Sequence, residues 1–246
     1  MKPEKPPSKP TYNDLGASHQ KEDVHAALKN ADKGLYPHAF CKIIPDIAKD
    51  PKYCSILHAD GAGTKSSLGY IMFKETGNLN FIGNLAQDSV VMNTDDVLCV
   101  GSAKSYMLSN TIGRNKKLIP GTLIAAVIDG YGQFLNTLQS YEYPILSCGG
   151  ETADMGDVIR TLVLDSTLIT RISREKVISA KNIQNGDVIV GLASDGKAEY
   201  EVSYNSGIGS NGLTLARHGV LSHEYYQKYP ECYAPELEEK WVFFGE

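Results

Sequence analysis

The stretch His58-Ala59-Asp60-Gly61-Ala62-Gly63-Thr64-Lys65 is the part of the sequence that most strongly indicates how the chain folds. It follows a short apolar run at residues 54–57, which predicts a buried strand. A carboxylate, two glycines, a hydroxyl and an amine then come in close succession. Such groups hold a magnesium–polyphosphate, because glycines let backbone N–H groups approach phosphate oxygens. The spacing of a Walker A loop is absent, and a strand entering a glycine-rich turn is often purely structural, so both interpretations stay open.

Length and composition are those of an ordinary water-soluble globular chain. The 246 residues are 42% hydrophobic and 22% charged with a net charge of −5, which excludes a basic surface for nucleic acid. No apolar run reaches the roughly 20 residues that span a bilayer. Residues 1–11 carry four prolines and three lysines, which predicts a disordered lead-in and not a secretory signal. The five cysteines form no C-x-x-C pair, so we expect free thiols in a cytoplasmic protein.

A second polar cluster lies on a segment that predicts a helix over residues 82–100, closed by Gly101. The helix holds Asp88, Asp95 and Asp96 among strongly apolar neighbours. Asp88 and Asp95 are close to two helical turns apart and share a face, whereas Asp96 lies about 80° away. Three acids on a helix can simply face solvent. On a buried helix, however, they need a partner such as a cation.

The other segments alternate between strand-like and helix-like patterns, which predicts an α/β fold. Residues 67–73 fit a strand or a short helix. Strands are expected at residues 105–108, 144–148, 162–172 and 188–193, a helix at 119–138, and the start of a strand at 241–244.

Two more polar stretches follow predicted elements. The strand at 144–148 runs into Gly149-Gly150-Glu151-Thr152-Ala153-Asp154-Met155, a second glycine-rich turn with a carboxylate and a hydroxyl. Further on, Ser210-Asn211-Gly212 precedes a helical segment, and Ser210 or Asn211 can be its N-cap. Free N–H groups at a helix start are a natural phosphate seat, although a simple capped helix explains the same residues.

Other kinds of site find no support in the sequence. The six histidines lack H-x-x-x-H and H-E-x-x-H spacing, which argues against zinc, and there is no G-x-S-x-G elbow. Residues 207–212 fit G-x-G-x-x-G only as a string, without an adjoining upstream strand. The basic cluster at 114–117 is best explained as a solvated loop.

In their fixed order, the four polar stretches resemble the aminoimidazole ribonucleotide synthetase family (phosphoribosylformylglycinamidine cyclo-ligase of purine biosynthesis). The family pattern D-G-V-G-T-K is matched at residues 60–65, except that Ala62 replaces valine. Its G-G-E-T-A-E-M is matched at residues 149–155 with Asp154 in place of glutamate. Its N-D pair corresponds to Asp95-Asp96, and its helix-start carboxylate to Asp88. The resemblance extends from about Tyr12 to about Leu221.

This resemblance implies a mixed-sheet α/β fold in two domains. Residues 12–174 would form an N-terminal domain that binds ATP and pairs with its twin in a homodimer, and residues 175–246 a partial C-terminal α/β domain. The family transfers a phosphoryl group from ATP to the amide oxygen of formylglycinamidine ribonucleotide, then closes the ring to aminoimidazole ribonucleotide with release of ADP and phosphate. The implied cofactors are therefore ATP and Mg²⁺, and the implied partners are the substrate and a second copy of the chain.

The resemblance also implies residue roles. Asp60, Asp88, Asp96 and Glu151 would hold magnesium, and Lys65, Asp96 and Glu151 would act in catalysis. Helix geometry prefers Asp95 opposite Asp88, but the family pattern prefers Asp96, which we expect to face the metal. The expected ATP- and substrate-binding positions are Asp60, Gly61, Gly63, Thr64, Lys65, Asp88, Gly150, Ser210, Asn211 and Gly212.

Three departures from the family pattern matter. Residues 34–40 replace the family's glycine-rich loop, and residues 197–208 are inserted before Ser210, where Gly209 takes the place of a histidine. The stretch after Arg174 is about half of what the family's second domain needs, so we expect a fragment or a divergent member that ends early. The alternatives are an ATP-using relative of the thiamine-monophosphate kinase or selenophosphate synthetase type, or an inactive nucleotide-binding and dimerisation module.

Overall fold

The computed structural model describes residues 9–102, 104–193, 195–204 and 209–245, which form two compact units. Asp32–Ser210 form one, the sheet unit; Met1–Ala31 and Asn211–Glu246 form the other, the terminal unit. Residues 1–8 of the predicted lead-in and 205–208 of the predicted insertion lie outside the described residues. The sheet unit extends past residue 174 to Ser210. The predicted domains, 12–174 and 175–246, stay a prediction.

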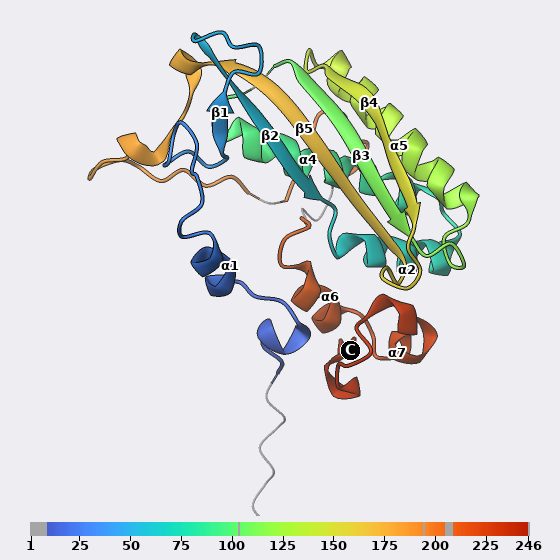
Figure 1. The fold of residues 1–246 in the computed structure, drawn as a ribbon. Coiled ribbons are helices and arrows are strands. Elements are labelled where there is room, and N and C mark those ends of the chain that lie inside the picture. Colours follow the sequence, from blue (N-terminus) through green and yellow to red (C-terminus); the bar gives the residue numbers. More distant parts are fainter. Residues whose placement is uncertain (1–8, 103, 194, 205–208, 246) are drawn as a thin grey trace, which may run out of the picture. The chain divides into compact units, whose positions relative to one another are not determined.

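One five-stranded mixed sheet with the order β1-β2-β5-β3-β4 forms the sheet unit (Figure 1). Neighbouring strands are antiparallel except β3 and β4, which run parallel. The strands are β1 (Ile43–Pro45), β2 (Tyr53–Gly61), β3 (Tyr106–Arg114), β4 (Ile145–Asp154) and β5 (Leu162–Ser173). The predicted mixed-sheet α/β fold is confirmed.

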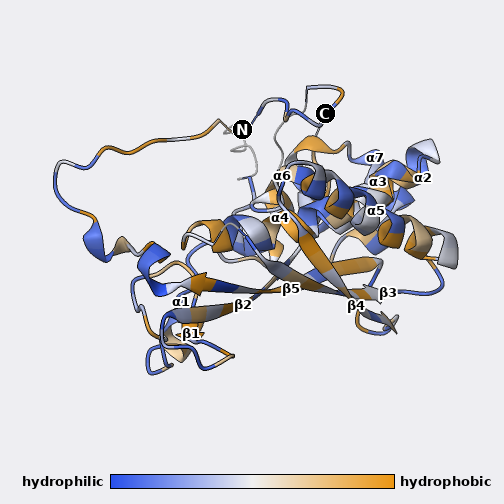
Figure 2. Cartoon of the chain, turned by 90° about the horizontal axis from the view of Figure 1, so that it is seen from above, coloured by the Kyte–Doolittle hydropathy of each residue, from blue (hydrophilic) through white to orange (hydrophobic). Residues whose placement is uncertain are grey.

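Four helices cover one face of this sheet, and Figure 2 shows all four on the same side. They are α2 (Lys65–Thr76), α3 (Asn80–Gly83), α4 (Leu85–Leu98) and α5 (Gly121–Ser140). Buried and more exposed residues alternate along β5, as a strand with one covered face requires. Its buried Leu164 and Leu168 are fully enclosed, as are Val90 and Val97 of α4 and Val127 of α5. The core therefore lies between the sheet and the helical layer.

Helices α3 and α5 approach each other through glycines. A Cβ atom on Gly130 would lie 3.0 Å from Gly83 Cα and closer still to the Gly83 carbonyl. A Cβ on Gly83 would lie 3.0 Å from the Ala126 carbonyl oxygen. Only residues without a side chain allow this backbone contact.

Several element boundaries differ from the sequence-based expectation. Strand β2 continues to Gly61 and pairs with β5 along its whole length, so Asp60 lies in a strand and not in a loop. The helix predicted at 82–100 is two helices, α3 and α4, separated at Asn84. Residues 67–73 lie in α2, which settles the strand-or-helix alternative in favour of the helix.

The predicted turn at residues 149–155 is wrong for most of its length, because β4 runs through to Asp154. Residues Gly150 to Asp154 pair with β3, after a register shift next to Gly149. Gly149 has a φ of +80°, which explains why a glycine is needed there. A Cβ on Gly150 would collide with Asn110 of β3. These glycines therefore serve a bulged strand.

Two predicted strands at the C-terminal side are also wrong. Residues 188–193 form no strand, and Val188, Ile189, Val190 and Leu192 are 79–100% exposed. A strand needs a neighbour to satisfy its backbone, and no described strand pairs with this segment. The apolar run at 241–244 begins in a short 3-10 helix and forms no strand, and only the next residue, Gly245, makes an isolated bridge, to Ser222.

The terminal unit consists of short helices. Its α6 buries Leu213, Arg217 and His218, and the His218 ring stacks on the fully buried Phe243 with centroids 5.0 Å apart. None of the described helices is long and apolar enough to cross a membrane. The helices of this unit are η1 (Asn13–Leu15), α1 (Glu22–Ala27), α6 (Leu213–Val220), α7 (Glu224–Lys228), η4 (Pro230–Cys232) and η5 (Glu239–Trp241); the sheet unit also has η2 (Arg174–Lys176) and η3 (Ala180–Asn182).

Candidate functional site

The candidate site is built around the junction between β2 and α2. Asp60 and Gly61 end the strand, and α2 starts at Lys65 with Thr64 as its N-cap residue. Gly63 has a φ of +53°, which a side chain would strain. The Ala62 N–H donates to the Leu164 carbonyl at 2.9 Å. This bond holds the turn against β5, so the start of α2 is fixed at the end of strand β2.

Lys65 and Asp88 are brought together by this turn and by α4. The Lys65 Nζ lies 2.6 Å from Asp88 Oδ1, and the two side chains are only 24% and 21% exposed. Burial raises the pKa of the Asp88 carboxyl, while the Lys65 ammonium lowers it. A half-buried ammonium beside a carboxylate is suited to bind a phosphate oxygen or a metal-bound phosphate. The sequence did not predict this contact, and the expected roles of Lys65 and Asp88 in ATP binding stay predictions.

A second pair joins β2 to the far end of α4. His58 Nε2 lies 3.1 Å from Asp96 Oδ2, an ion pair when the imidazole is protonated. Asp96 is therefore the one of the two adjacent acids that contacts β2. Burial raises the pKa of both acids; Asp96 further raises that of Asp95, and the Asp60 charge acts in the same direction on Asp96.

The end of β2 is acidic. Asp60 Oδ1 accepts from the Gly61 N–H at 2.7 Å. Across the strand, Asp165 of β5 pairs with Gly61, and a Cβ on Gly61 would collide with its carboxylate. Burial, and then the Asp60 charge, raise the pKa of Asp165. A cation bound beside two neighbouring carboxylates relieves the repulsion between their charges.

The donor set suits magnesium bound together with a nucleotide. Among the described residues, no three His, Cys, Asp or Glu side chains gather closely enough to hold a metal by themselves. Magnesium bound with phosphates needs only one or two protein carboxylates. Asp60 and Asp96, which interact electrostatically, meet that requirement. Asp88 contacts Lys65 in this structure, and its expected role as a metal ligand stays a prediction.

Glu151 is not brought to this cluster. The pairing register places Gly61, Asp165, Thr111 and Glu151 in one row across four strands, so Glu151 is about 14 Å from Gly61 at the usual strand spacing. Its carboxylate accepts from the Thr152 N–H at 3.0 Å. Its expected metal and catalytic roles, and the binding role of Gly150 beside it, stay predictions.

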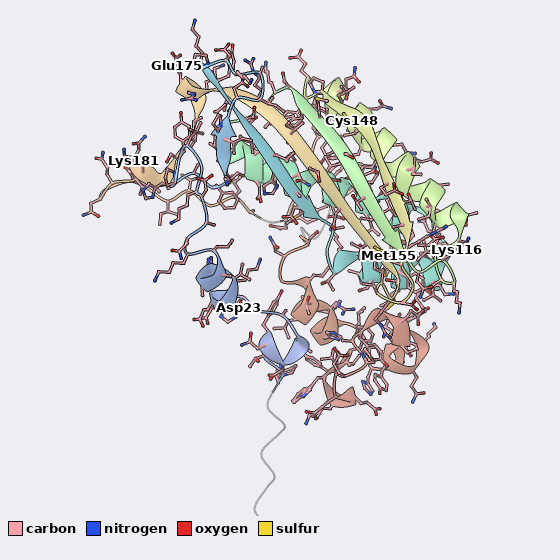
Figure 3. The ribbon with its side chains drawn as sticks, viewed as in Figure 1. Asp23, Lys116, Cys148, Met155, Glu175 and Lys181 are labelled. Atoms are coloured by element: carbon pink, nitrogen blue, oxygen red, sulfur yellow. The ribbon has the colours of Figure 1, made fainter. Side chains whose placement is uncertain are left out.

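A pocket at the end of β4 is lined by charged residues, among them Lys116, Lys117, Asp154 and Asp157. Met155 lies beyond the end of β4, near Lys116, whereas Cys148 lies farther back on the strand (Figure 3). Asp154 pairs with Arg114 at 2.6 Å and with Lys116 at 3.8 Å. The basic cluster at 114–117 therefore begins in β3, and the Asp154 carboxylate partly neutralises its charge.

The Ser210-Asn211-Gly212 stretch falls at the border of the two units. Ser210 ends the sheet unit, and Asn211 and Gly212 belong to the terminal unit. The expected capping by Ser210 or Asn211 is wrong, because the N-cap of α6 is Gly212, in left-handed geometry and without a side-chain cap. The role of the stretch as a ribose-phosphate seat stays a prediction.

Four residues at this junction were not among the predicted site residues: His58, Asn93, Asp165 and Ser166. His58 lay inside the quoted motif, but a histidine in a strand has many uses. Asn93 and Ser166 are fully or almost fully buried polar residues within apolar runs. That contrast is the only signal by which the sequence could have pointed to them.

Fold and site together define an α/β domain with a largely acidic strand-to-helix junction that carries one lysine. A family model described as "AIR synthase related protein, N-terminal domain" matches residues 41–172. The chain belongs to this family.

Relatives with assigned names cover most of the chain. A phosphoribosylformylglycinamidine cyclo-ligase of Methanocaldococcus jannaschii is 30% identical over 219 residues, which cover 84% of this chain and 53% of that protein. One from Thermococcus kodakarensis is 33% identical over 158 residues, covering 64% and 40%. A solved structure, "T. maritima PurL complexed with FGAR", aligns with a TM-score of 0.40 and 11% identity over 68% of this chain and 26% of that one. The chain spans about half the length of the curated relatives it matches.

Proposed function

We propose that the chain is the ATP-binding part of a phosphoribosylformylglycinamidine cyclo-ligase, a cytoplasmic enzyme of purine biosynthesis. The observation that carries this proposal is the β2–α2 junction, where Lys65 lies 2.6 Å from Asp88 beside the acidic end of β2. The names of the curated relatives support the same reaction. The proposed reaction consumes ATP and formylglycinamidine ribonucleotide and releases aminoimidazole ribonucleotide, ADP and phosphate.

Each residue of the junction has a proposed task. Lys65 exchanges its contact with Asp88 for one with a phosphate oxygen. Asp60 and Asp96 hold Mg²⁺, which neutralises charge on the phosphates when bound. Thr64 and the glycines on either side of Ala62 bring backbone N–H groups to the phosphate chain. Catalysis then rests on charge neutralisation and alignment, which is how phosphoryl transfer is usually promoted.

A second candidate is a nucleotide-binding module without turnover. The ligase reaction is named for relatives of which this chain covers about half (53% of one of them), so turnover by these residues alone is a proposal separate from nucleotide binding. The two candidates differ in one measurable property, namely whether bound ATP is consumed when the substrate is present.

The test measures Mg²⁺-dependent nucleotide binding and ADP release with formylglycinamidine ribonucleotide present. We expect tight binding only with Mg²⁺, and about a 10-fold or greater loss in Asp60→Asn, because a carboxylate that holds the metal is removed. The matched control is Asp129→Asn, which makes the same charge change on α5 of the same unit.

The outcomes separate the candidates. ADP release that depends on the substrate supports the ligase, and binding without release leaves only the module. Unchanged binding in Asp60→Asn would show that the metal assignment is wrong.

We also propose that the chain is a homodimer through the sheet face opposite helices α2, α3, α4 and α5. Leu57, Ile169, Met107 and Leu146 are cross-strand partners in one row. Leu57, Met107 and Leu146 are 61%, 47% and 62% exposed. A row of exposed apolar side chains on a sheet face supports burial against another surface.

A further inference from the structure

Asn93 of α4 lies at the centre of the hydrogen bonds that join α4 to the sheet, and its side chain is fully buried. Its Nδ2 lies 3.0 Å from the Asp60 carbonyl, 3.0 Å from the Ser89 carbonyl and 3.1 Å from the Ser166 carbonyl. The two hydrogens of one amide nitrogen are thus shared among carbonyls of β2, α4 and β5. Asp60 and Ser166 are cross-strand partners, so Asn93 spans the strand pair at the residue expected to hold the metal.

The orientation of the amide follows from these three contacts. Since carbonyl oxygens only accept, the Asn93 nitrogen must face them, and Oδ1 faces the other way. Oδ1 lies 3.1 Å from His58 Nδ1, and because Oδ1 only accepts, the Nδ1 must donate. The other ring nitrogen, Nε2, then points at Asp96, 3.1 Å from Oδ2. Asn93 therefore orients the Asp60 backbone directly and the Asp96 carboxylate through His58.

The surroundings leave Asn93 little freedom to adjust. Ser89 Oγ and Ser166 Oγ lie 2.7 Å apart, and the Tyr131 hydroxyl lies 3.1 Å from Ser166 Oγ. A closed buried network of this kind holds its members in one geometry, because each lost bond leaves a desolvated group unpaired.

We propose that Asn93 is a positioning residue that sets the distance and direction between Asp60 and Asp96. This inference rests on the proposed Mg²⁺–nucleotide function of that pair. Without the amide, Asp60 stays in β2 and Asp96 in α4. The hydrogen bonds that fix the position of one residue relative to the other are then lost. Magnesium then binds less tightly, although both ligands are still present.

The experiment compares Asn93→Ala with Ser102→Ala. Ser102 Oγ bonds Thr170 Oγ1 at 2.7 Å, so the control also removes a buried hydrogen bond to β5. Thr170 lies four residues from Ser166 along the strand, about 13 Å away. The measurements are amide hydrogen exchange of residues 58–65 without ligand, and the Mg²⁺ concentration that half-saturates nucleotide binding.

In Asn93→Ala we expect faster exchange at residues 58–65 and a rise of about 10-fold in the half-saturating Mg²⁺ concentration. Ser102→Ala should change neither. If Asn93→Ala is folded and matches Ser102→Ala in both measurements, the inference is overturned.

A second variant covers the case in which Asn93→Ala does not fold. His58→Phe keeps a ring at the partly exposed end of the network and removes the two ring nitrogens that face Asn93 and Asp96. We expect it to raise the half-saturating Mg²⁺ concentration, by a smaller factor than Asn93→Ala. If this variant had the half-saturating Mg²⁺ concentration of the wild type, the inference would be overturned and the proposed function would stand. Absence of Mg²⁺-dependent binding in the wild-type chain would overturn the proposed function and, with it, this inference.

Discussion

At the scale of single residues, His218 gives the clearest pH prediction. It is fully buried, and its Nδ1 accepts the Phe243 N–H at 3.2 Å. Burial, and then the Arg217 charge, lower its pKa from 6.5 to about 4. Between those values the unfolded chain binds a proton that the folded chain does not, so stability falls as the pH falls. From pH 7 to pH 5 we expect the terminal unit to lose about 2 kcal/mol.

Chemical denaturation at both pH values measures this loss, with the intrinsic fluorescence of Trp241 reporting on the terminal unit. His218→Asn can still accept from Phe243 but does not titrate, and it should remove most of the pH dependence. His223→Asn, at the partly exposed start of α7 in the same unit, is the control and should retain it. If the free energy of unfolding changed equally with pH in the wild type and in His218→Asn, the prediction would be contradicted.

At the scale of elements, the close contact between α3 and α5 determines how replacing a glycine of α5 by alanine changes stability. Gly130 and Gly132 lie in the same helix, but only Gly130 faces a backbone, and a Cβ on Gly132 would meet nothing within 4 Å. We expect Gly132→Ala to stabilise by up to about 1 kcal/mol through helix propensity. Gly130→Ala should destabilise by about 1–3 kcal/mol, because α3 must move away. Thermal unfolding of the two variants checks this difference. Similar shifts of the melting temperature in both variants would argue against the close contact of α3 and α5.

At the scale of the whole molecule, the row of exposed apolar side chains on the sheet face opposite the four helices predicts the oligomeric state. We expect a dimer in sedimentation at micromolar concentration. Leu57→Asp should give monomers, because it places a charge in the apolar row. Leu98→Asp is the control, since Leu98 is 42% exposed at the end of α4. A wild-type monomer, or a dimer that survives Leu57→Asp, would argue against this face.

Much of the candidate site could be predicted because its residues lie in local motifs. The turn from Asp60 to Lys65 and the acids of α4 are each continuous in sequence, and the fold brings Lys65 and Asp88 into contact. Glu151 was grouped with them by the resemblance, yet three strand spacings separate it from Gly61. The order of strands in a sheet comes from long-range pairing, which local pattern does not contain.

The strand errors have a common origin. Residues 149–154 carry glycines that resemble a turn, but pairing with β3 makes them a bulged strand. Residues 188–193 carry a strand pattern but have no partner among the described strands. In both cases the presence or absence of a neighbouring strand overrides the local propensity.

The sequence by itself determined the family, the α/β class and the chemistry available at the β2–α2 junction, because these depend on residue types in short, ordered motifs. Only the tertiary structure decided that Lys65 pairs with Asp88, that Asp96 and not Asp95 contacts His58, and that Asn93 joins His58 to the Asp60 backbone. Side-chain contacts between β2 and α4 depend on helix phase and on the packing of the layer, and a small rotation of α4 would change every one of them.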